Sequence, residues 1–214
     1  MSDITIVGTG NVGAGIAARG VAAGHSLPLL DRDVDTARQL AGTLDVDADP
    51  GTVGDEPTGD IVVLAVPFEA AEEIVADYGA ALSGKTVVDI TNPVDFDTFD
   101  SLVVAPGTSA AETIAGLADD GVHVVKAFNT TFAAPVRTGE VAGQPLDVFI
   151  AGESDQAKEK VSGFASAAGL RPIDVGPLRR TRHLEGFQFV VMTLQADPAS
   201  PAFNWDTALK ILTP

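Results

Sequence analysis

The sequence contains no cysteine among its 214 residues, which excludes disulfide bonds, thiolate metal ligands and a cysteine nucleophile. Basic residues are scarce, because 13 lysines and arginines stand against 30 aspartates and glutamates, a formal net charge of −17. Such a negative field disfavours binding to nucleic acid and to anionic membranes. No apolar run reaches the roughly 18 residues that a membrane span requires, and no basic, apolar leader precedes the first predicted strand. We therefore expect a cytoplasmic protein.

The excess of acidic residues has two interpretations. An acidic surface stays hydrated and keeps a protein soluble at high salt, where the repulsion between its charges is screened. The alternative is an ordinary acidic protein of the cytoplasm. We favour the halophilic interpretation, because the chain contains only five lysines among its 214 residues.

The first thirty residues carry the strongest functional pattern. An apolar run, Ile4–Val7, predicts a strand buried on both faces. The segment 8–13 (Gly-Thr-Gly-Asn-Val-Gly) follows directly, an alanine-rich run over 14–23 predicts a helix, and Asp31 comes directly after a second strand at 27–30. A Gly-x-Gly-x-x-Gly motif between a strand and a helix, with an acidic residue about 20 positions on, is typical of dinucleotide binding.

Each position of the motif has a physical role in that interpretation. Gly8 allows the tight turn, Gly10 lets the backbone approach a pyrophosphate, and Gly13 permits close helix–strand packing. The Asp31 carboxylate would accept hydrogen bonds from a ribose 2′-OH, whereas the Arg32 guanidinium could bind a 2′-phosphate. The residues expected to hold the adenosine and pyrophosphate are Gly8, Thr9, Gly10, Asn11, Val12, Gly13, Asp31 and Arg32. The alternative is a glycine-rich turn without a ligand, followed by a solvated turn at 31–32.

The rest of the chain alternates between strand and helix patterns. Further strands are predicted at 60–66, 85–90, 122–128, 147–151 and 171–175, and helices at 33–41, 68–78, 109–118, 154–168, 178–194 and 205–212. Residues 42–59 and 135–145 read as loops, the first with at most one short strand near Val46. This alternation predicts an α/β protein with a doubly wound, Rossmann-type parallel sheet. We divide it into a dinucleotide-binding domain, 1–143, and a smaller C-terminal α/β and helical part, 144–214, that completes the cofactor cleft.

In such sheets, ligands lie beyond the carboxyl ends of the strands. The residues found there are Ala65, Val66, Pro67 and Phe68, then Thr91, Asn92 and Pro93, and then Asn129, Thr130 and Thr131. No catalytic acid, base or nucleophile is predicted. The three histidines are isolated and lack metal-ligand spacing, so no metal site is expected either. The single tyrosine, Tyr78, has Leu82 four residues on, so the Tyr-x-x-x-Lys pair of short-chain dehydrogenases is absent.

A basic cluster begins the long helix predicted at 178–194. Arg179, Arg180 and Arg182 stand beside His183, and they could hold an anionic second ligand or form surface ion pairs. The same helix carries apolar residues that could form a homodimer interface or ordinary core: Phe187, Phe189, Val190 and Leu194. The sequence does not choose between these alternatives.

Together, four segments resemble a known family. They are the glycine-rich motif, Asp-Ile-Thr-Asn-Pro at 89–93, Lys-Ala-Phe-Asn-Thr at 126–130 and Gly-Pro-Leu-Arg-Arg at 176–180. The chain resembles the NADP oxidoreductases that depend on the deazaflavin coenzyme F420, to which the cytosolic domain of STEAP metalloreductases is related. The resemblance implies hydride transfer between NADPH and F420. It places the nicotinamide near Val66, Pro67 and Asn92, and the deazaflavin in a cleft formed with the C-terminal part.

Two positions depart from the family pattern. The family holds the 2′-phosphate with a Ser-Arg pair and a Lys four residues after the Arg, whereas this chain has Asp31, Arg32 and Thr36. NADP(H) and NAD(H) are therefore both open as cofactors. The archaeal enzymes also have a histidine where this chain has Asn129 or its neighbours. The alternatives are a reductase of another acceptor, such as a flavin or ferric chelate, and a non-catalytic dinucleotide sensor.

Overall fold

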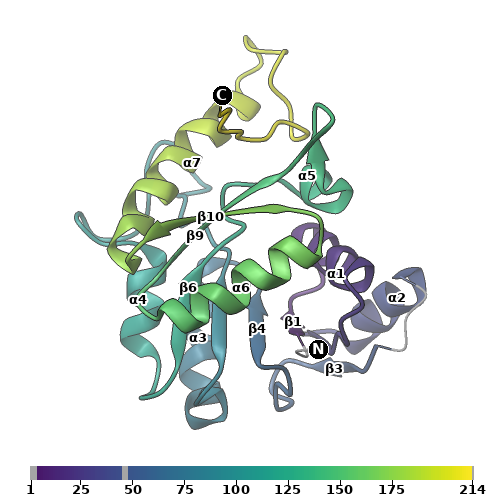
Figure 1. Ribbon diagram of the computed structural model, residues 1–214. Helices are drawn as coiled ribbons and strands as arrows, with labels where there is room; N and C mark the ends of the chain where they lie inside the picture. The colour runs from purple at the N-terminus through teal and green to yellow at the C-terminus, as the bar shows by residue number, and fades with distance from the viewer. Residues whose placement is uncertain (1–3, 45–47, 214) are drawn as a thin grey trace.

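The computed structural model describes residues 4–44 and 48–213. An eight-stranded sheet forms its centre, in the order β10-β9-β6-β5-β4-β1-β2-β3, with helices on both faces (Figure 1). The strands of this sheet are β1 (Ile4–Val7), β2 (Leu29–Asp31), β3 (Pro50–Thr52), β4 (Ile61–Leu64), β5 (Thr86–Asp89), β6 (His123–Lys126), β9 (Asp147–Gly152) and β10 (Arg171–Gly176). The predicted doubly wound α/β fold is confirmed.

Seven α-helices are present among the described residues. They are α1 (Asn11–Ala22), α2 (Val34–Leu44), α3 (Phe68–Tyr78), α4 (Ala110–Leu117), α5 (Ala133–Thr138), α6 (Asp155–Ala167) and α7 (Thr181–Ala196). Short 3₁₀ turns at Gly79–Leu82 and Leu178–Arg180 follow α3 and precede α7. No helix in the described part of the chain combines the length and apolarity that crossing a membrane would need.

Alternate residues of the central strands belong to two different hydrophobic cores. Ile61 and Val63 of β4 face the core that contains α1, α2 and α6, whereas Val62 and Leu64 face the core that contains α3 and α4. This alternation follows from the two-residue period of a strand, and it explains why these strands are apolar on both faces. The sheet is therefore fixed from both sides, which holds its carboxyl edge in place.

One strand pair runs against the predicted parallel order. β6 and β9 are antiparallel, and only Val125 and Lys126 pair with Gly152 and Ala151. Because the end of β9 pairs with the end of β6, the earlier residues of β9 extend beyond the carboxyl edge of the central strands. β10 then pairs with β9 in parallel. The strands of the predicted C-terminal part thus continue the main sheet and flank its carboxyl edge, while the division at residue 143 stays a prediction.

Three local predictions were wrong or incomplete. Residues 135–145 are not simply a loop, because α5 ends at Thr138 and a small hairpin follows, β7 (Glu140–Val141) with β8 (Gln144–Pro145). Residues 205–212 form turns and irregular chain instead of a helix. The Ile211 N–H donates to the Asp147 carboxylate at 2.8 Å. This N–H is therefore not available for the hydrogen bond that a helix would need. In segment 42–59 a strand forms at Pro50–Thr52, while Val46 lies outside the described residues.

Candidate dinucleotide-binding site

The glycines of the motif differ in what surrounds them. Gly8 has φ +95°, and a Cβ there would lie 2.4 Å from the Ala65 carbonyl oxygen. A Cβ on Gly13 would lie 2.0 Å from the Gly8 carbonyl oxygen. Gly10 has an ordinary φ of −66°, and a Cβ there would have no atom within 4 Å. Turn geometry and close packing require glycine at 8 and 13, whereas nothing in the protein itself requires it at Gly10.

The N-terminus of α1 carries no side-chain cap. Gly10 is its N-cap residue and makes no side-chain cap, and the first turn contains no acidic residue. By contrast, α4 and α6 are capped by Ser109 and Ser154, and each has an acidic residue in its first turn. The N–H groups and the positive dipole end of α1 are therefore left for an anion such as a pyrophosphate.

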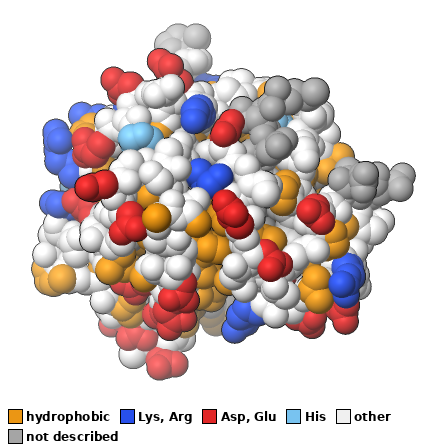
Figure 2. All heavy atoms as spheres, turned by 90° about the horizontal axis from the view of Figure 1, so that it is seen from below, with side chains coloured by type: hydrophobic (Ala, Val, Ile, Leu, Met, Phe, Trp, Pro, Cys, Tyr) orange, Lys and Arg blue, Asp and Glu red, His pale blue; other side chains and the backbone are white. Residues whose placement is uncertain are grey.

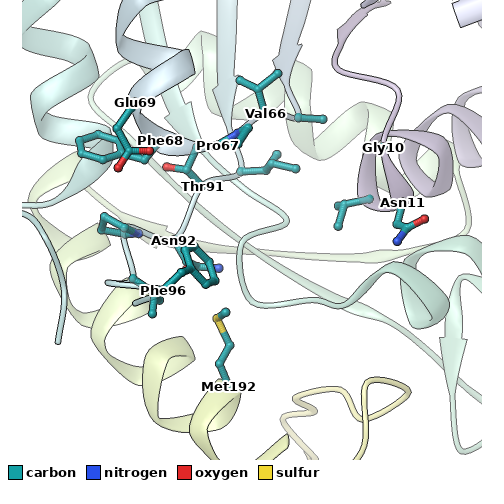
Figure 3. A pocket seen from close by; sticks show the side chains of 15 residues that line it. Gly10, Asn11, Val66, Pro67, Phe68, Glu69, Thr91, Asn92, Phe96 and Met192 are labelled. Atoms are coloured by element: carbon teal, nitrogen blue, oxygen red, sulfur yellow. The ribbon is translucent and has the colours of Figure 1, made fainter. Parts of the chain in front are cut away.

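Two cavities meet beside Gly10. The first has a volume of about 410 Å³ and lies over the ends of β4 and β5 (Figure 3). The second, about 310 Å³, lies toward the end of β2 and is lined by Asp31, Arg32 and Thr36. Both cavities share Gly10 and the segment 65–67. An elongated ligand could therefore pass the start of α1 with one end in each cavity.

Most of the predicted cofactor-binding residues line these two cavities. Gly8, Asp31 and Arg32 line the second, Asn11, Val12, Asn92 and Pro93 line the first, and Gly10, Ala65, Val66 and Pro67 line both. Thr9, Gly13, Asn129 and Thr130 line neither. Thr130 instead contributes to a separate cavity of about 450 Å³ beside α7 and the C-terminal segment.

Asp31 makes local contacts in addition to lining the second cavity. One carboxylate oxygen accepts hydrogen bonds from the Thr9 N–H at 2.8 Å and from the Thr9 hydroxyl at 2.6 Å, and the other accepts from the Asp33 N–H at 3.2 Å. Burial alone would raise the pKa of Asp31, but these hydrogen bonds outweigh it and lower that pKa. Asp31 is therefore ionised at neutral pH and joins the end of β2 to the glycine-rich turn.

Asn92 is held by an exchange of hydrogen bonds with Asn129. The Asn92 amide donates to the Asn129 carbonyl oxygen at 2.8 Å, and the Asn129 amide donates to the Asn92 side-chain oxygen at 3.0 Å. Phe128, directly before Asn129, has φ +61°, the left-handed region that a bulky residue rarely adopts. Asn129 thus lies behind the cavity and supports a residue that lines it.

Two arginines of the basic cluster, which spans the 3₁₀ turn at Leu178–Arg180 and the start of α7, are occupied by other contacts. Arg182 forms a two-point ion pair with Glu112 of α4, at 2.6 and 2.5 Å, and this hydrogen bonding lowers the pKa of Glu112. Arg180 donates to the Val175 carbonyl oxygen. Arg179 and Arg182 line neither cavity of the candidate site. This arrangement agrees with the surface ion pairs that the sequence left as one of two interpretations.

Sequence reasoning missed a buried ionic network behind the first cavity. The Lys126 ammonium lies 2.8 Å from the Asp89 carboxylate and 2.7 Å from the Glu185 carboxylate, and all three side chains are fully buried. A charged residue at the end of each of two apolar strands, Asp89 and Lys126, was the available signal. The distant Glu185 on α7 carried none. Met192 and Phe96, which also line the first cavity, were missed as well.

Residues 3–93 match the protein family described as NADP oxidoreductase, coenzyme F420-dependent. An F420-dependent NADP reductase from Methanothermobacter thermautotrophicus is 29% identical over 200 residues, which cover 86% of this chain and 85% of that protein. The predicted resemblance to this family is confirmed. The rat metalloreductase STEAP3 is 28% identical over 182 residues, covering 85% of this chain but only 35% of the longer protein. With these relatives, the prediction of an oxidoreductase is also confirmed.

Solved structures share the fold over almost the whole chain. A crystal structure from Arthrobacter sp. FB24, provisionally described as an F420-dependent NADP reductase, has a TM-score of 0.79 at 26% identity and covers 98% of this chain and 100% of its own. The 3-hydroxyisobutyrate dehydrogenase of Mycobacterium tuberculosis has a TM-score of 0.62 at 16% identity, with coverage of 91% and 61%, and is similar in fold alone.

Proposed function

We propose that this oxidoreductase transfers a hydride between a nicotinamide dinucleotide, NADP(H) or NAD(H), and the deazaflavin coenzyme F420. The surroundings of Gly10 are the main support for binding of the dinucleotide. Gly10 has open space where a side chain would stand, at the uncapped start of α1, between two cavities. The family match and the named relatives support F420 as the second substrate.

The two cavities divide the dinucleotide between them in this proposal. Asp31 and Arg32 hold the adenosine end, and the first turn of α1, from Gly10 to Gly13, holds the pyrophosphate. Val66, Pro67, Asn92 and Pro93 hold the nicotinamide end. The proposal assigns Asn129 and Thr130 to the binding of the second cofactor. Asn129 would also hold Asn92 in place, because the Asn92 amide donates a hydrogen bond to the Asn129 carbonyl oxygen.

The bound cofactors supply the hydride chemistry, so the protein has to hold them and exclude water. The first cavity suits that task, since its lining is mainly apolar: Val66, Pro67, Phe68, Ile90, Phe96 and Met192 take part in it (Figure 3). Glu69 is the one titratable side chain among its described lining residues. The proposal assigns Glu69 no role as a catalytic acid or base, because the bound cofactors supply the hydride chemistry.

The proposal is tested by titrating the protein with NADPH and NADH at high salt, followed by oxidised F420. We expect tight binding of at least one dinucleotide and loss of the absorbance of oxidised F420. Binding of a dinucleotide without loss of F420 absorbance would favour either a reductase of another acceptor or a non-catalytic sensor. Assays with FMN and ferric citrate as acceptors would distinguish these two alternatives. Turnover with either would indicate a reductase of another acceptor, and no turnover would indicate a sensor. The absence of any dinucleotide binding would reject the proposal.

We further propose that α7 and the C-terminal segment form a homodimer interface. Phe187 and Val190, three residues apart and so on one face of α7, are 56% and 51% exposed. Ile211 and Leu212 of the C-terminal segment are also exposed, at 48% and 72%. Phe187 and Ile211 line the same cavity, so the apolar exposure of the two segments is continuous, and a second copy would cover it.

A further inference from the structure

The buried Lys126 ammonium reaches three separate parts of the fold. It lies 2.8 Å from Asp89 at the end of β5 and 2.7 Å from Glu185 of α7. It also donates to the Thr91 carbonyl oxygen at 2.6 Å. An ammonium group has three N–H donors, so these three acceptors use all of them. Lys126 therefore joins β5, the segment that follows β5, and α7 at one point.

In the segment after β5, both the N–H and the carbonyl oxygen of Thr91 are held by buried charged side chains. The Thr91 N–H donates to the Asp89 carboxylate at 2.7 Å, and its carbonyl oxygen accepts from Lys126. Asn92 and Pro93, the next two residues, line the first cavity, as does Thr91 itself (Figure 3). A shift of Lys126 would therefore be transmitted directly to the floor of this cavity.

Glu185 connects the same ammonium to two helices. Its carboxylate accepts hydrogen bonds from the Ala110 N–H at 2.9 Å and the Ala111 N–H at 3.3 Å, at the start of α4. Burial raises the pKa of Glu185, and the neighbouring Asp89 adds to this, while Lys126 opposes it. On α7, Glu185 lies seven residues, about two turns, before Met192, which forms another wall of the first cavity. The network thus holds two parts of the first cavity, the segment 91–93 and the helix that carries Met192.

We infer that Lys126 is a positioning residue for the nicotinamide end of the site, which it controls through Thr91 and, by way of Glu185, through α7. The inference rests on the proposed function, since it concerns the same cavity. Burying three charges is a weak source of stability, because their desolvation cancels much of their attraction. Holding Thr91, Asn92 and Met192 in register is a role that an apolar cluster could not reproduce.

The test separates the two ends of the ligand. We compare the dissociation constants of NADPH and of 2′-phospho-ADP-ribose, which lacks the nicotinamide, by titration calorimetry. NADH and ADP-ribose replace them if the wild type prefers NADH. The main variant is the neutral triple Lys126→Met, Asp89→Asn, Glu185→Gln, which leaves no buried charge unpaired. We expect its NADPH dissociation constant to rise by about 10- to 100-fold, the scale of a small misplacement at a site. The affinity for 2′-phospho-ADP-ribose should stay within about twofold.

Lys158→Met is the matched control. Lys158 is also nearly buried and pairs with two carboxylates, Asp155 at 3.0 Å and Asp174 at 2.9 Å, but lines neither cavity. Its loss should leave both affinities unchanged. If the triple variant does not fold, Glu185→Gln takes its place. That single variant keeps the Lys126–Asp89 pair and should weaken NADPH about threefold, again without affecting the fragment.

Three outcomes overturn the inference. The fragment and NADPH could weaken equally, which would indicate a general loss of structure. Both affinities could stay at their wild-type values, which would indicate a network for stability alone. The Lys158→Met variant could match the triple variant, which would remove the specificity of the effect. Failure of the wild-type protein to bind NADPH or NADH would instead reject the proposed function.

Discussion

Thr9 and Asp31, 22 residues apart, are joined by two hydrogen bonds to the same carboxylate oxygen. A single side chain at the end of β2 thus holds the second residue of the glycine-rich turn through its N–H and its hydroxyl. The same ionised carboxylate lines the cavity proposed for the adenosine end, beside Arg32. We therefore expect cofactor choice to depend on a negative and a positive side chain that are adjacent in the chain, Asp31 and Arg32.

Replacing Asp31 should change the preference between the two dinucleotides. The Asp31→Asn variant keeps the side-chain size and removes a negative charge that would repel a 2′-phosphate, so the ratio of NADPH to NADH affinity should rise about tenfold, or about 1.4 kcal/mol. Arg32→Gln should lower the same ratio. Calorimetric titration with both dinucleotides measures it. Equal ratios in the wild type and both variants would mean that this cavity does not receive the 2′ position.

Gly10→Ser should abolish dinucleotide binding without unfolding the protein. A side chain at Gly10 meets no protein atom, and serine is a better N-cap than glycine, so the melting temperature should hold or rise slightly. The added atoms would stand where the pyrophosphate approaches α1, and the affinity should fall by at least about 100-fold.

Gly13→Ala is the contrasting variant for this test. Its Cβ would lie 2.0 Å from the Gly8 carbonyl oxygen, so it should lower the melting temperature and disturb binding only through the fold. Thermal melts and fluorescence titrations distinguish the two variants. Retained binding in Gly10→Ser would remove the central observation behind the proposed function.

Local patterns in the sequence were sufficient for the central fold and for many of the residues that line the two cavities. The apolar strands, the glycine motif and Asp31 are close in the sequence and follow periodic rules, so both cavities could be located by their strand ends. The network of Asp89, Lys126 and Glu185 could not be predicted in full, since Glu185 is 59 residues from Lys126 and only tertiary packing brings them together.

The antiparallel pairing of β9 shows the same limit. Its sequence, Asp-Val-Phe-Ile-Ala-Gly, reads as a buried strand, but no local feature states its direction. The C-terminal segment misled the prediction for a different reason. Its helical pattern is overridden by Asp147, which accepts hydrogen bonds from Lys210 at 2.6 Å and from the Ile211 N–H at 2.8 Å. A distant buried carboxylate decided the conformation of residues with no strong preference.

Asp147 should make the attachment of the C-terminal segment depend on pH. Burial alone would raise its pKa, but hydrogen bonds from Arg171, Lys210 and the Ile211 N–H outweigh burial and lower it below 3.8. A lowered pKa in the folded state stabilises the protein above the unfolded value of 3.8, and this stability is lost as the pH falls through the folded pKa. Thermal melts of the wild type should therefore fall steeply below about pH 4.

The Asp147→Asn variant tests the same contact at neutral pH. It removes charge-assisted hydrogen bonds and should cost about 2–3 kcal/mol of unfolding free energy. It should also make the segment after Asp197 more sensitive to carboxypeptidase and should flatten the acid dependence of the melting temperature. Lys160→Met, a change on α6, serves as the control. An unchanged digestion rate in Asp147→Asn would contradict the anchoring role.

Charge on α7 should prevent the proposed homodimer. The double variant Phe187→Glu, Val190→Glu places two carboxylates on the exposed apolar face, where a second copy would have to bury them. Sedimentation equilibrium at high salt should give a dimer for the wild type and a monomer for this variant. The matched control, Val103→Glu, changes another exposed apolar residue, 50% exposed, outside the proposed interface. A monomeric wild type would reject the interface.

Salt should stabilise this protein by screening its own charge. Figure 2 shows acidic side chains scattered over one face of the molecule, and the formal net charge of the chain is −17. Their mutual repulsion acts against the compact state, and at 1 M salt the screening length falls to about 3 Å. A recovery of about 3 kcal/mol between 0.1 and 3 M KCl would raise the melting temperature by about 10 °C.

Two comparisons separate screening from a general effect of solute. Sucrose stabilises compact states by exclusion without screening charge, so it should not reproduce the steep rise of the melting temperature in the first molar of KCl. Glu72→Gln removes one of the four acidic side chains of α3, and burial and then Glu69 raise the pKa of Glu72. This variant should melt higher than the wild type at low salt, and the difference should shrink in 3 M KCl, because salt screens the repulsion from Glu69 but not the cost of burying the Glu72 carboxylate. A melting temperature independent of KCl would instead identify an ordinary acidic protein.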